Sequence, residues 1–348
     1  MKLEVRRLEA RMRAPVVSSH GSVSVRPLIL VSLTGEDGVT GYGEAAPLQS
    51  YDGVGIEDVL AALEDCREVL AADPGTPRAA LLASCARAAV LPQAVAAVDL
   101  ALWDLEGRRA GVPVWRLLGA SSPDAVEVNA SLAVPDRSTA ATAAAEARQA
   151  GFRCVKVKVG LGDDAGRLAA VRAFAGPAMA IRIDANGAWS VQEAVAALRG
   201  LGPVGIECCE EPASGVEAVG EVAAQVPVAV ALDESVREPG ALATRVCDAV
   251  CLKISGCGGI SGVIETARQA RAVGYEVYLA STYDGPLGIA AALHAAAALT
   301  PDRACGLATL GMFEGRGNML APLFGRITVP TGPGLGEGLV DWYGAGAG

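Results

Sequence analysis

The chain has 348 residues, enough to bury a large core in one or two domains. Its formal net charge of −10 argues against a nucleic acid or an anionic membrane surface as a partner, because both are negatively charged themselves. Hydrophobic residues make up 51% of the chain and aromatic residues only 4%, which predicts an aliphatic core in which small residues let helices pack closely.

The nine cysteines form no Cys-x-x-Cys pair, and most lie in apolar runs, where free cysteine behaves as a small hydrophobic residue. We therefore expect reduced, buried thiols rather than disulfides. The first nine residues lack the apolar centre of a signal peptide, and no uncharged run reaches the ~18 residues that a membrane span needs. These features predict a cytoplasmic protein.

The N-terminal part is expected to form strands first and helices second. Alternating or apolar runs predict strands at residues 3–8, 27–33 and 39–45. The stretch 15–25 is polar and contains glycine, so we expect it to be irregular and mobile. Helical patterns follow at residues 56–72, 77–90 and 92–109. This order predicts an α+β capping domain over residues 1–122.

From residue 126 onward, strand-like and helix-like segments alternate. Strands are expected at residues 126–132, 154–159, 180–184, 204–209, 228–232, 249–254, 276–280 and 304–307. Eight strands with about seven helices between them indicate a closed barrel rather than an open sheet. We therefore predict an α/β fold, a (β/α)7β TIM-like barrel over residues 123–325. The tail 326–348 is expected to return to the capping domain.

Charged residues end several of these expected strands. Asp184, Glu210, Asp233 and Lys253 follow one another at steps of 26, 23 and 20 residues, about the length of one strand–helix unit. A barrel brings the ends of its strands to one face, where active sites lie. The spacing therefore predicts that these four side chains meet.

Two further lysines are expected to point into the barrel. Val155, Val157 and Val159 occupy alternate positions that face the helices, so Lys156 and Lys158 must face the interior. Two buried ammonium groups are costly unless carboxylates or an anionic ligand compensate them. The alternative is an edge strand whose lysines are solvated.

Each acid alone could simply cap the helix that follows it. Three acids at the ends of successive strands favour a shared site instead. The alternation of side chains does not decide which acid at the fourth expected strand belongs to this site, because Glu207, Glu210 and Glu211 are all candidates. Oxygen ligands without histidine or cysteine suit Mg²⁺ or Mn²⁺ rather than zinc.

Five motifs occur in this order: V-K-V-K-V at 155–159, I-D-A-N-G at 183–187, E-E-P at 210–212, L-D-E-S at 232–235 and L-K-I-S-G-C-G-G at 252–259. Together with G-Y-G-E-A-A-P at 41–47, which matches an N-terminal capping domain, this set resembles the enolase superfamily. More narrowly it is similar to the muconate-lactonising subgroup, which includes muconate cycloisomerases, o-succinylbenzoate synthases and dipeptide epimerases. The resemblance covers nearly the whole chain.

The resemblance implies a role for each charged residue. The acids that match the family's metal ligands are Asp184, Glu210 and Asp233. Lys158 matches the base on one face of the substrate, and Lys253 the acid/base group on the opposite face. Lys156 would lower the pKa of Lys158 and contact the substrate. The mandelate-racemase subgroup instead uses a late histidine, and His294 lies in a helical run, which disfavours that subgroup.

Substrate contacts are expected from the cap segment 16–22, which carries His20, and from the segment 281–286 after the seventh strand. Candidate substrate-binding residues are Asn186, Asp284, Ser281 and His20. Asp284 stands where cycloisomerases of the subgroup carry glutamate, and a single aspartate does not reproduce the paired aspartates of dipeptide epimerases. It could equally be a turn-forming residue.

The resemblance implies a Mg²⁺-dependent isomerase, with Mn²⁺ as a further metal. Such an enzyme would remove the proton α to a substrate carboxylate and form a metal-stabilised enolate. We expect a cycloisomerase or a racemase/epimerase acting on a small carboxylate, in a homo-oligomer without nucleic acid or membrane. Three alternatives remain: an o-succinylbenzoate synthase, a class I aldolase with a Schiff base on Lys253, and a non-catalytic binding protein.

Overall fold

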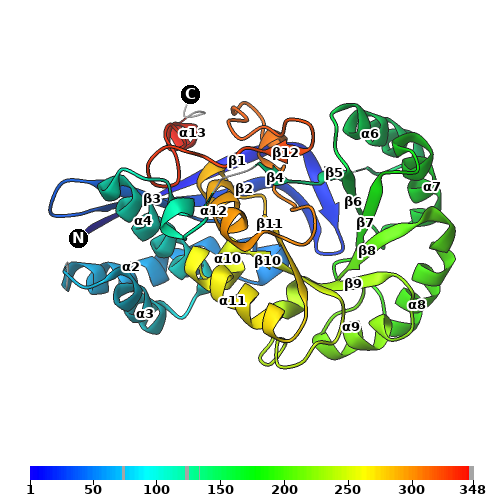
Figure 1. The fold of residues 1–348 in the computed structure, drawn as a ribbon, viewed down its shortest axis with the longest axis horizontal. Helices are drawn as coiled ribbons and strands as arrows, with labels where there is room; N and C mark the ends of the chain where they lie inside the picture. The colour runs from blue at the N-terminus through cyan, green and yellow to red at the C-terminus, as the bar shows by residue number, and fades with distance from the viewer. Residues whose placement is uncertain (73–74, 122–124, 133, 345–348) are drawn as a thin grey trace.

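The computed structural model describes residues 1–72, 75–121, 125–132 and 134–344. The expected domain boundary between residues 122 and 123 falls outside these ranges. Figure 1 shows two parts, a sheet with helices at the N-terminus and a ring of strands with helices outside it. The ring confirms the predicted TIM-like barrel.

The N-terminal sheet is antiparallel, with the order β1 (Lys2–Ser18), β2 (Gly21–Thr34) and β3 (Thr40–Ala45). The expectation of an irregular stretch at 15–25 is wrong. After a register shift beyond Arg11, β1 and β2 pair again from Val16↔Val23 to Ser18↔Gly21. Cross-strand bonds join backbone groups, so polar side chains do not prevent this pairing. The resulting hairpin reaches from the capping domain to the barrel (Figure 1).

Helices pack on this sheet at the predicted positions: α2 (Ile56–Ala72), α3 (Arg78–Ala89) and α4 (Pro92–Ala110). Helix α4 lies very close to β3. A Cβ built on Gly43 would come within 2.0 Å of the Ala97 carbonyl oxygen, and one on Gly41 within 2.3 Å of the Ala101 oxygen. Only glycine permits this approach. The short helix α1 (Gln49–Asp52) follows β3 and is joined to α4 by a hydrogen bond that the Gln93 side chain donates to Asp52 at 2.9 Å.

The barrel strands pair in parallel in chain order: β5 (Ala130–Leu132), β6 (Cys154–Lys158), β7 (Ala180–Asp184), β8 (Ile206–Glu210), β9 (Ala229–Leu232), β10 (Ala249–Lys253) and β11 (Glu276–Ala280). Two expectations need correction. The first expected strand is split, because β4 (Val126–Glu127) pairs with β12 (Arg326–Ile327) outside the barrel. The expected strand at 304–307 makes only the isolated bridges Val128↔Cys305 and Ala280↔Gly306, which close the ring.

Outside the barrel lie the helices α6 (Arg137–Gln149), α7 (Asp164–Ala175), α8 (Val191–Gly200), α9 (Val216–Ala223), α11 (Ile260–Ala272) and α12 (Pro286–Leu299). Short helical turns complete the structure: α5 (Val114–Leu117), η1 (Gly202–Val204), η2 (Glu234–Arg237), α10 (Ile254–Cys257), η3 (Leu310–Met312) and α13 (Asp341–Gly344). The connection from β9 to β10 carries only η2 among these elements, so one of the expected helices is replaced by a single turn.

His294 lies in a helix, α12, as the sequence predicted, and its side chain is buried. Its Nδ1 accepts a hydrogen bond from the Trp115 amide at 3.2 Å, so its role is to join α12 to α5.

Within the described residues, no helix combines the length and the apolar character that crossing a membrane requires. All nine cysteines are free thiols and none is exposed, in line with the expectation.

The C-terminal tail returns to the capping domain. Tyr343 donates a hydrogen bond to Glu44 of β3, and the Leu335 amide donates to Asp104 of α4 at 2.7 Å. The proposed limits of this tail, 326–348, remain a prediction.

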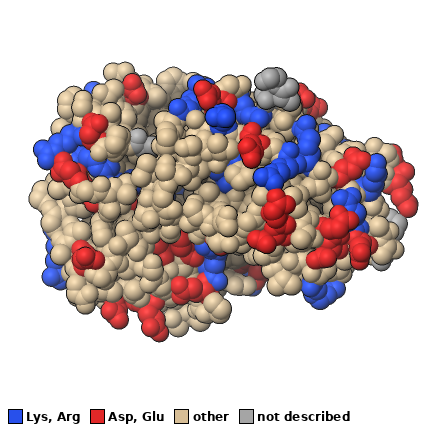
Figure 2. Space-filling model, turned by 180° about the vertical axis from the view of Figure 1, so that it is seen from behind, with Lys and Arg blue, Asp and Glu red and all other residues tan. Residues whose placement is uncertain are grey.

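On the face shown in Figure 2, acidic and basic side chains are interspersed.

Candidate active site

Strand register brings the predicted charged residues to one end of the barrel. Lys158 lies beside Asp184, and Asp184 beside Glu210, each at the last position of its strand. Asp233 directly follows β9, and Lys253 is the last residue of β10. The four residues of the spacing argument, Asp184, Glu210, Asp233 and Lys253, therefore lie at the same end of the barrel, and Lys158 lies there with them.

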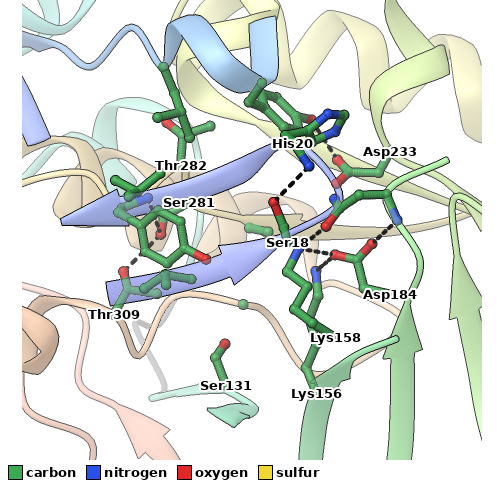
Figure 3. Close-up of a pocket in the computed structure, with 18 of the residues that line it drawn as sticks. Ser18, His20, Ser131, Lys156, Lys158, Asp184, Asp233, Ser281, Thr282 and Thr309 are labelled. Atoms are coloured by element: carbon green, nitrogen blue, oxygen red, sulfur yellow. Dashed lines mark hydrogen bonds and ion pairs between the residues drawn. The ribbon is translucent and has the colours of Figure 1, made fainter. Parts of the chain in front are cut away.

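The order of the strands gives the site two sides. The three acids come from consecutive strands, β7, β8 and β9, whereas Lys158 and Lys253 come from β6 and β10, one strand beyond on each side. Figure 3 shows Lys156, Lys158, Asp184 and Asp233 grouped at one end of the cavity. Lys158 and Lys253 thus approach the three carboxylates from opposite sides.

Ammonium groups compensate every one of these carboxylates. Lys156 Nζ lies 2.8 Å from Asp184 Oδ2 and also contacts Glu210. Lys158 Nζ lies 2.6 Å from the same Asp184 oxygen. Lys253 Nζ lies 2.6 Å from Asp233 Oδ2. The inward direction predicted for Lys156 and Lys158 is confirmed, and the solvated edge strand is excluded.

These pairings set the charge states. Burial alone would lower the pKa of Lys156 and Lys253, but the adjacent carboxylates outweigh it and raise both above the usual value. Burial would raise the pKa of Asp184, but Lys156 and Lys158 hold it far below its ordinary range.

The donor set fits a divalent cation, although its geometry differs from the predicted trio. Oxygens of Glu210 and Asp233 and the Cys251 sulfur all lie within 4.8 Å of one another, whereas Asp184 is joined to Glu210 through Lys156. Burial raises the pKa of the Cys251 thiol, which keeps its proton, and Mg²⁺ prefers oxygen. Glu210 Oε1 is buried without a hydrogen-bond partner among the described residues. The carboxylates of Asp184, Glu210 and Asp233 could therefore hold Mg²⁺ or Mn²⁺.

Next to Glu210 lies a buried arginine, Arg182, to which the sequence analysis gave no role. Arg182 is fully buried, and its Nη1 lies 3.6 Å from Glu210 Oε1. The same nitrogen donates to the Ala304 carbonyl at 3.0 Å, and the guanidinium carbon lies 4.3 Å from the ring centre of Tyr278. The sequence indicated the position of Arg182 only through strand alternation: it lies two residues before Asp184 and therefore faces the same side of the strand. Arg182 places a fixed positive charge behind the Glu210 carboxylate.

Backbone strain marks the residues that follow the strands. Asn186, Glu211 and Tyr283 have φ values of 47°, 39° and 58°, in the left-handed region that costs such residues about 1–3 kcal/mol. Asn186 accepts from Lys158 Nζ at 2.5 Å and donates to Glu234 at 2.8 Å. Its side chain therefore holds Lys158 in place.

The left-handed backbone conformation of Glu211 decides which of the three glutamates at β8 faces the site. Glu210 points into the site, whereas Glu211 accepts hydrogen bonds from the Asp233 amide at 2.7 Å and the Ser235 amide at 3.1 Å. Glu207 lies 2.9 Å from Arg303, at the opposite end of its strand. Glu211 thus positions Asp233 and is not itself part of the carboxylate set.

The capping domain contributes side chains to the site. His20 Nε2 lies 3.0 Å from Glu234 Oε1, and Ser19 donates to the Asn186 carbonyl at 2.8 Å. Tyr51 of α1 was missed by sequence reasoning. Its hydroxyl donates to Asp233 at 3.0 Å and accepts from Lys253 at 2.6 Å. An aromatic residue soon after the G-Y-G-E-A-A-P motif was the only available signal.

Of the two candidates in the segment 281–286, only one lines the cavity. Ser281 does so, next to Thr309. Asp284 is buried outside the cavity lining, and its carboxylate accepts from the Thr282 hydroxyl at 2.6 Å and the Thr282 amide at 3.2 Å. The substrate contact expected at Asp284 is therefore not what the structure shows, and the turn-forming alternative fits instead.

Comparisons with known proteins agree with this geometry. Residues 2–119 match the family description "Mandelate racemase / muconate lactonizing enzyme, N-terminal domain", and residues 139–341 match "Enolase C-terminal domain-like". Muconate cycloisomerase 1 of Rhodococcus opacus is 31% identical over 353 residues, covering 92% of each chain. The N-succinyl-L-Arg/Lys racemase of Bacillus cereus is 28% identical over 296 residues, covering 82% of this chain and 80% of the racemase. The structure of a dipeptide epimerase from Cytophaga hutchinsonii, complexed with Mg and the dipeptide D-Ala-L-Val, has a TM-score of 0.88 at 26% identity and covers 96% of this chain and 94% of the epimerase.

Proposed function

Because the chain belongs to the mandelate racemase/muconate lactonizing enzyme family of the enolase superfamily, we propose that it inverts the configuration of a carbon atom next to a substrate carboxylate. This reaction, a racemisation or epimerisation, lies within the isomerase chemistry of its relatives. The substrate is a small carboxylate.

The placement of Lys158 and Lys253 supports this choice. Inversion needs one group that removes the α-proton on one side and another that returns a proton on the other side. The two lysines flank the three acids from β6 and β10. Lys156, between Asp184 and Glu210, keeps positive charge beside the substrate carboxylate.

Asp184, Glu210 and Asp233 would hold Mg²⁺. The bound ion would supply positive charge to the substrate carboxylate oxygens, where negative charge grows as the α-proton leaves. Tyr51 and Asn186 keep the two lysines aimed at the cavity through the hydrogen bonds described above.

The test is proton exchange at the α-carbon in D₂O with Mg²⁺, followed by proton NMR and chiral chromatography. Single enantiomers of N-acyl amino acids and dipeptides should be offered, together with muconate and the o-succinylbenzoate precursor. At least one substrate should take up α-deuterium and invert, and EDTA should stop both until Mg²⁺ is restored. Exchange in no substrate would contradict the proposal, and so would lactone or dehydration products formed without inversion.

A further inference from the structure

The cavity above the barrel has a charged end and a neutral end. It encloses about 850 Å³ of space, counted together with its opening to solvent. Its charged lining residues, Lys156, Lys158, Asp184, Asp233 and Lys253, all belong to the group at the strand ends. Figure 3 shows Ser281, Thr282 and Thr309 together on the other side of the cavity.

The neutral end offers hydroxyl groups and apolar walls. Ser281 and Thr309 are 2.8 Å apart through their hydroxyl oxygens. Met312 adds apolar surface to the cavity lining, and Ser131 of β5 lies next to Lys156 in strand register. Hydroxyl groups both donate and accept hydrogen bonds, so this end can bind an amide carbonyl or N–H.

Among the described residues, no charged side chain lines the neutral end of the cavity. Asp284 is engaged by Thr282. Glu234 is not among the residues that line the cavity; its Oε1 contacts His20 and Asn186, and its Oε2 is buried without a hydrogen-bond partner among the described residues. Arg26 is buried and donates to the carbonyls of Pro47 and Ala46 at 2.6 and 3.0 Å.

Resting on the proposed function, we propose that the substrates are carboxylates whose remaining part is uncharged, namely amino acids with a neutral N-acyl group. A free ammonium group or a second carboxylate at the neutral end would lose its hydration without gaining a counter-charge, which is costly. A neutral acyl amide instead matches the hydroxyl groups, and an aliphatic side chain matches the apolar walls. This separates the chain from relatives that bind dipeptides or N-succinyl amino acids.

Two matched pairs of leucine derivatives test the charge alone. Glycyl-L-leucine is N-acetyl-L-leucine with an added ammonium group, and N-succinyl-L-leucine is N-butanoyl-L-leucine with a carboxylate in place of the terminal methyl group. The kcat/KM for α-deuterium exchange should be about 10- to 150-fold higher for the neutral member of each pair. A charged member that equals or exceeds its neutral partner would overturn the inference.

The panel also separates this inference from the proposed function. If none of the four leucine derivatives exchanges but another carboxylate does, the substrate class is wrong and the proposed function stands. If no carboxylate exchanges at all, the proposed function itself fails, and the inference fails with it.

A variant that places a charge at the neutral end gives an independent readout. Thr309→Asp supplies a carboxylate there, and Thr309→Asn has the same shape without the charge. The ratio of kcat/KM for glycyl-L-leucine to that for N-acetyl-L-leucine should be about 10- to 150-fold higher in the aspartate variant than in the asparagine variant. Equal ratios in the two variants would contradict the inference. If circular dichroism shows that Thr309→Asp does not fold, Ser281→Asp and Ser281→Asn provide the same comparison, because Ser281 contacts Thr309.

Discussion

Replacing Lys158 with alanine is expected to abolish α-proton removal from one enantiomer of the substrate and to spare removal from the other. Lys253→Ala should show the opposite preference. The reason is the strand order, which places the two lysines on opposite sides of the three acids. Loss of a positioned base should slow exchange about 10²- to 10⁴-fold. Proton NMR in D₂O, started from each pure enantiomer, measures the four rates.

Both variants also remove a partner of a buried carboxylate, since Lys158 contacts Asp184 and Lys253 contacts Asp233. Lys158→Met and Lys253→Met keep more of the side-chain volume and serve as matched controls, and Mg²⁺ titration of each variant shows whether the acids still bind metal. The assignment of two bases is refuted if both variants lose the same enantiomer, or if neither loses any exchange while binding Mg²⁺ normally.

The stability of the protein should fall between about pH 5 and pH 8 because of Glu44. This carboxyl group is buried where β3, the segment 281–286 and the C-terminal tail meet. Burial, with the nearby Asp284 charge as the next contribution, raises the pKa of Glu44 from 4.5 to about 8. Hydrogen bonds from Tyr343 and from the Gly285 amide, at 2.8 Å for the latter, oppose that shift but do not cancel it.

The sign follows from the raised pKa. The folded protein binds the Glu44 proton more tightly than the unfolded chain, so this contribution to stability is complete below the unfolded pKa. It is lost as the pH rises through about 8. The loss should be on the order of a few kcal/mol, because each pKa unit corresponds to about 1.4 kcal/mol.

Urea unfolding at a series of pH values from 5 to 8.5 measures the effect. Wild-type protein should lose stability steadily over this range, whereas Glu44→Gln, which stays uncharged, should show a flatter profile. Asp284→Asn is the companion variant, because removing the neighbouring negative charge should lower the pKa of Glu44 and shift the fall to lower pH. Parallel wild-type and Glu44→Gln profiles would show that Glu44 does not titrate in this range.

The charged end of the cavity could be predicted because strand parity is a local property of sequence. Valine at alternate positions of 155–159 required Lys156 and Lys158 to face the interior, and the structure places them there. The same rule could not decide among the glutamates of β8. Glu211 adopts a left-handed backbone conformation, which glutamate rarely does and which its residue type does not signal.

The parts that could not be predicted depend on contacts between distant segments. Tyr51 reaches Asp233 across 182 positions of the chain, and no local pattern marks it. The hairpin at 15–25 is stabilised by backbone pairing and by its contact with Asn186, so its polar side chains were misleading. Asp284 does not line the cavity, and its carboxylate accepts hydrogen bonds from Thr282, two residues earlier, a contact that the sequence did not reveal.

The central claim is that Asp184, Glu210 and Asp233 share one divalent cation between Lys158 and Lys253. Anomalous diffraction from crystals grown with Mn²⁺ tests it most directly. The account predicts a single strong peak coordinated by carboxylate oxygens of all three acids, at about 2.1 Å, the distance typical of small divalent ions such as Mg²⁺. A peak elsewhere, a site ligated by Cys251 without Asp184, or no peak at all would contradict it.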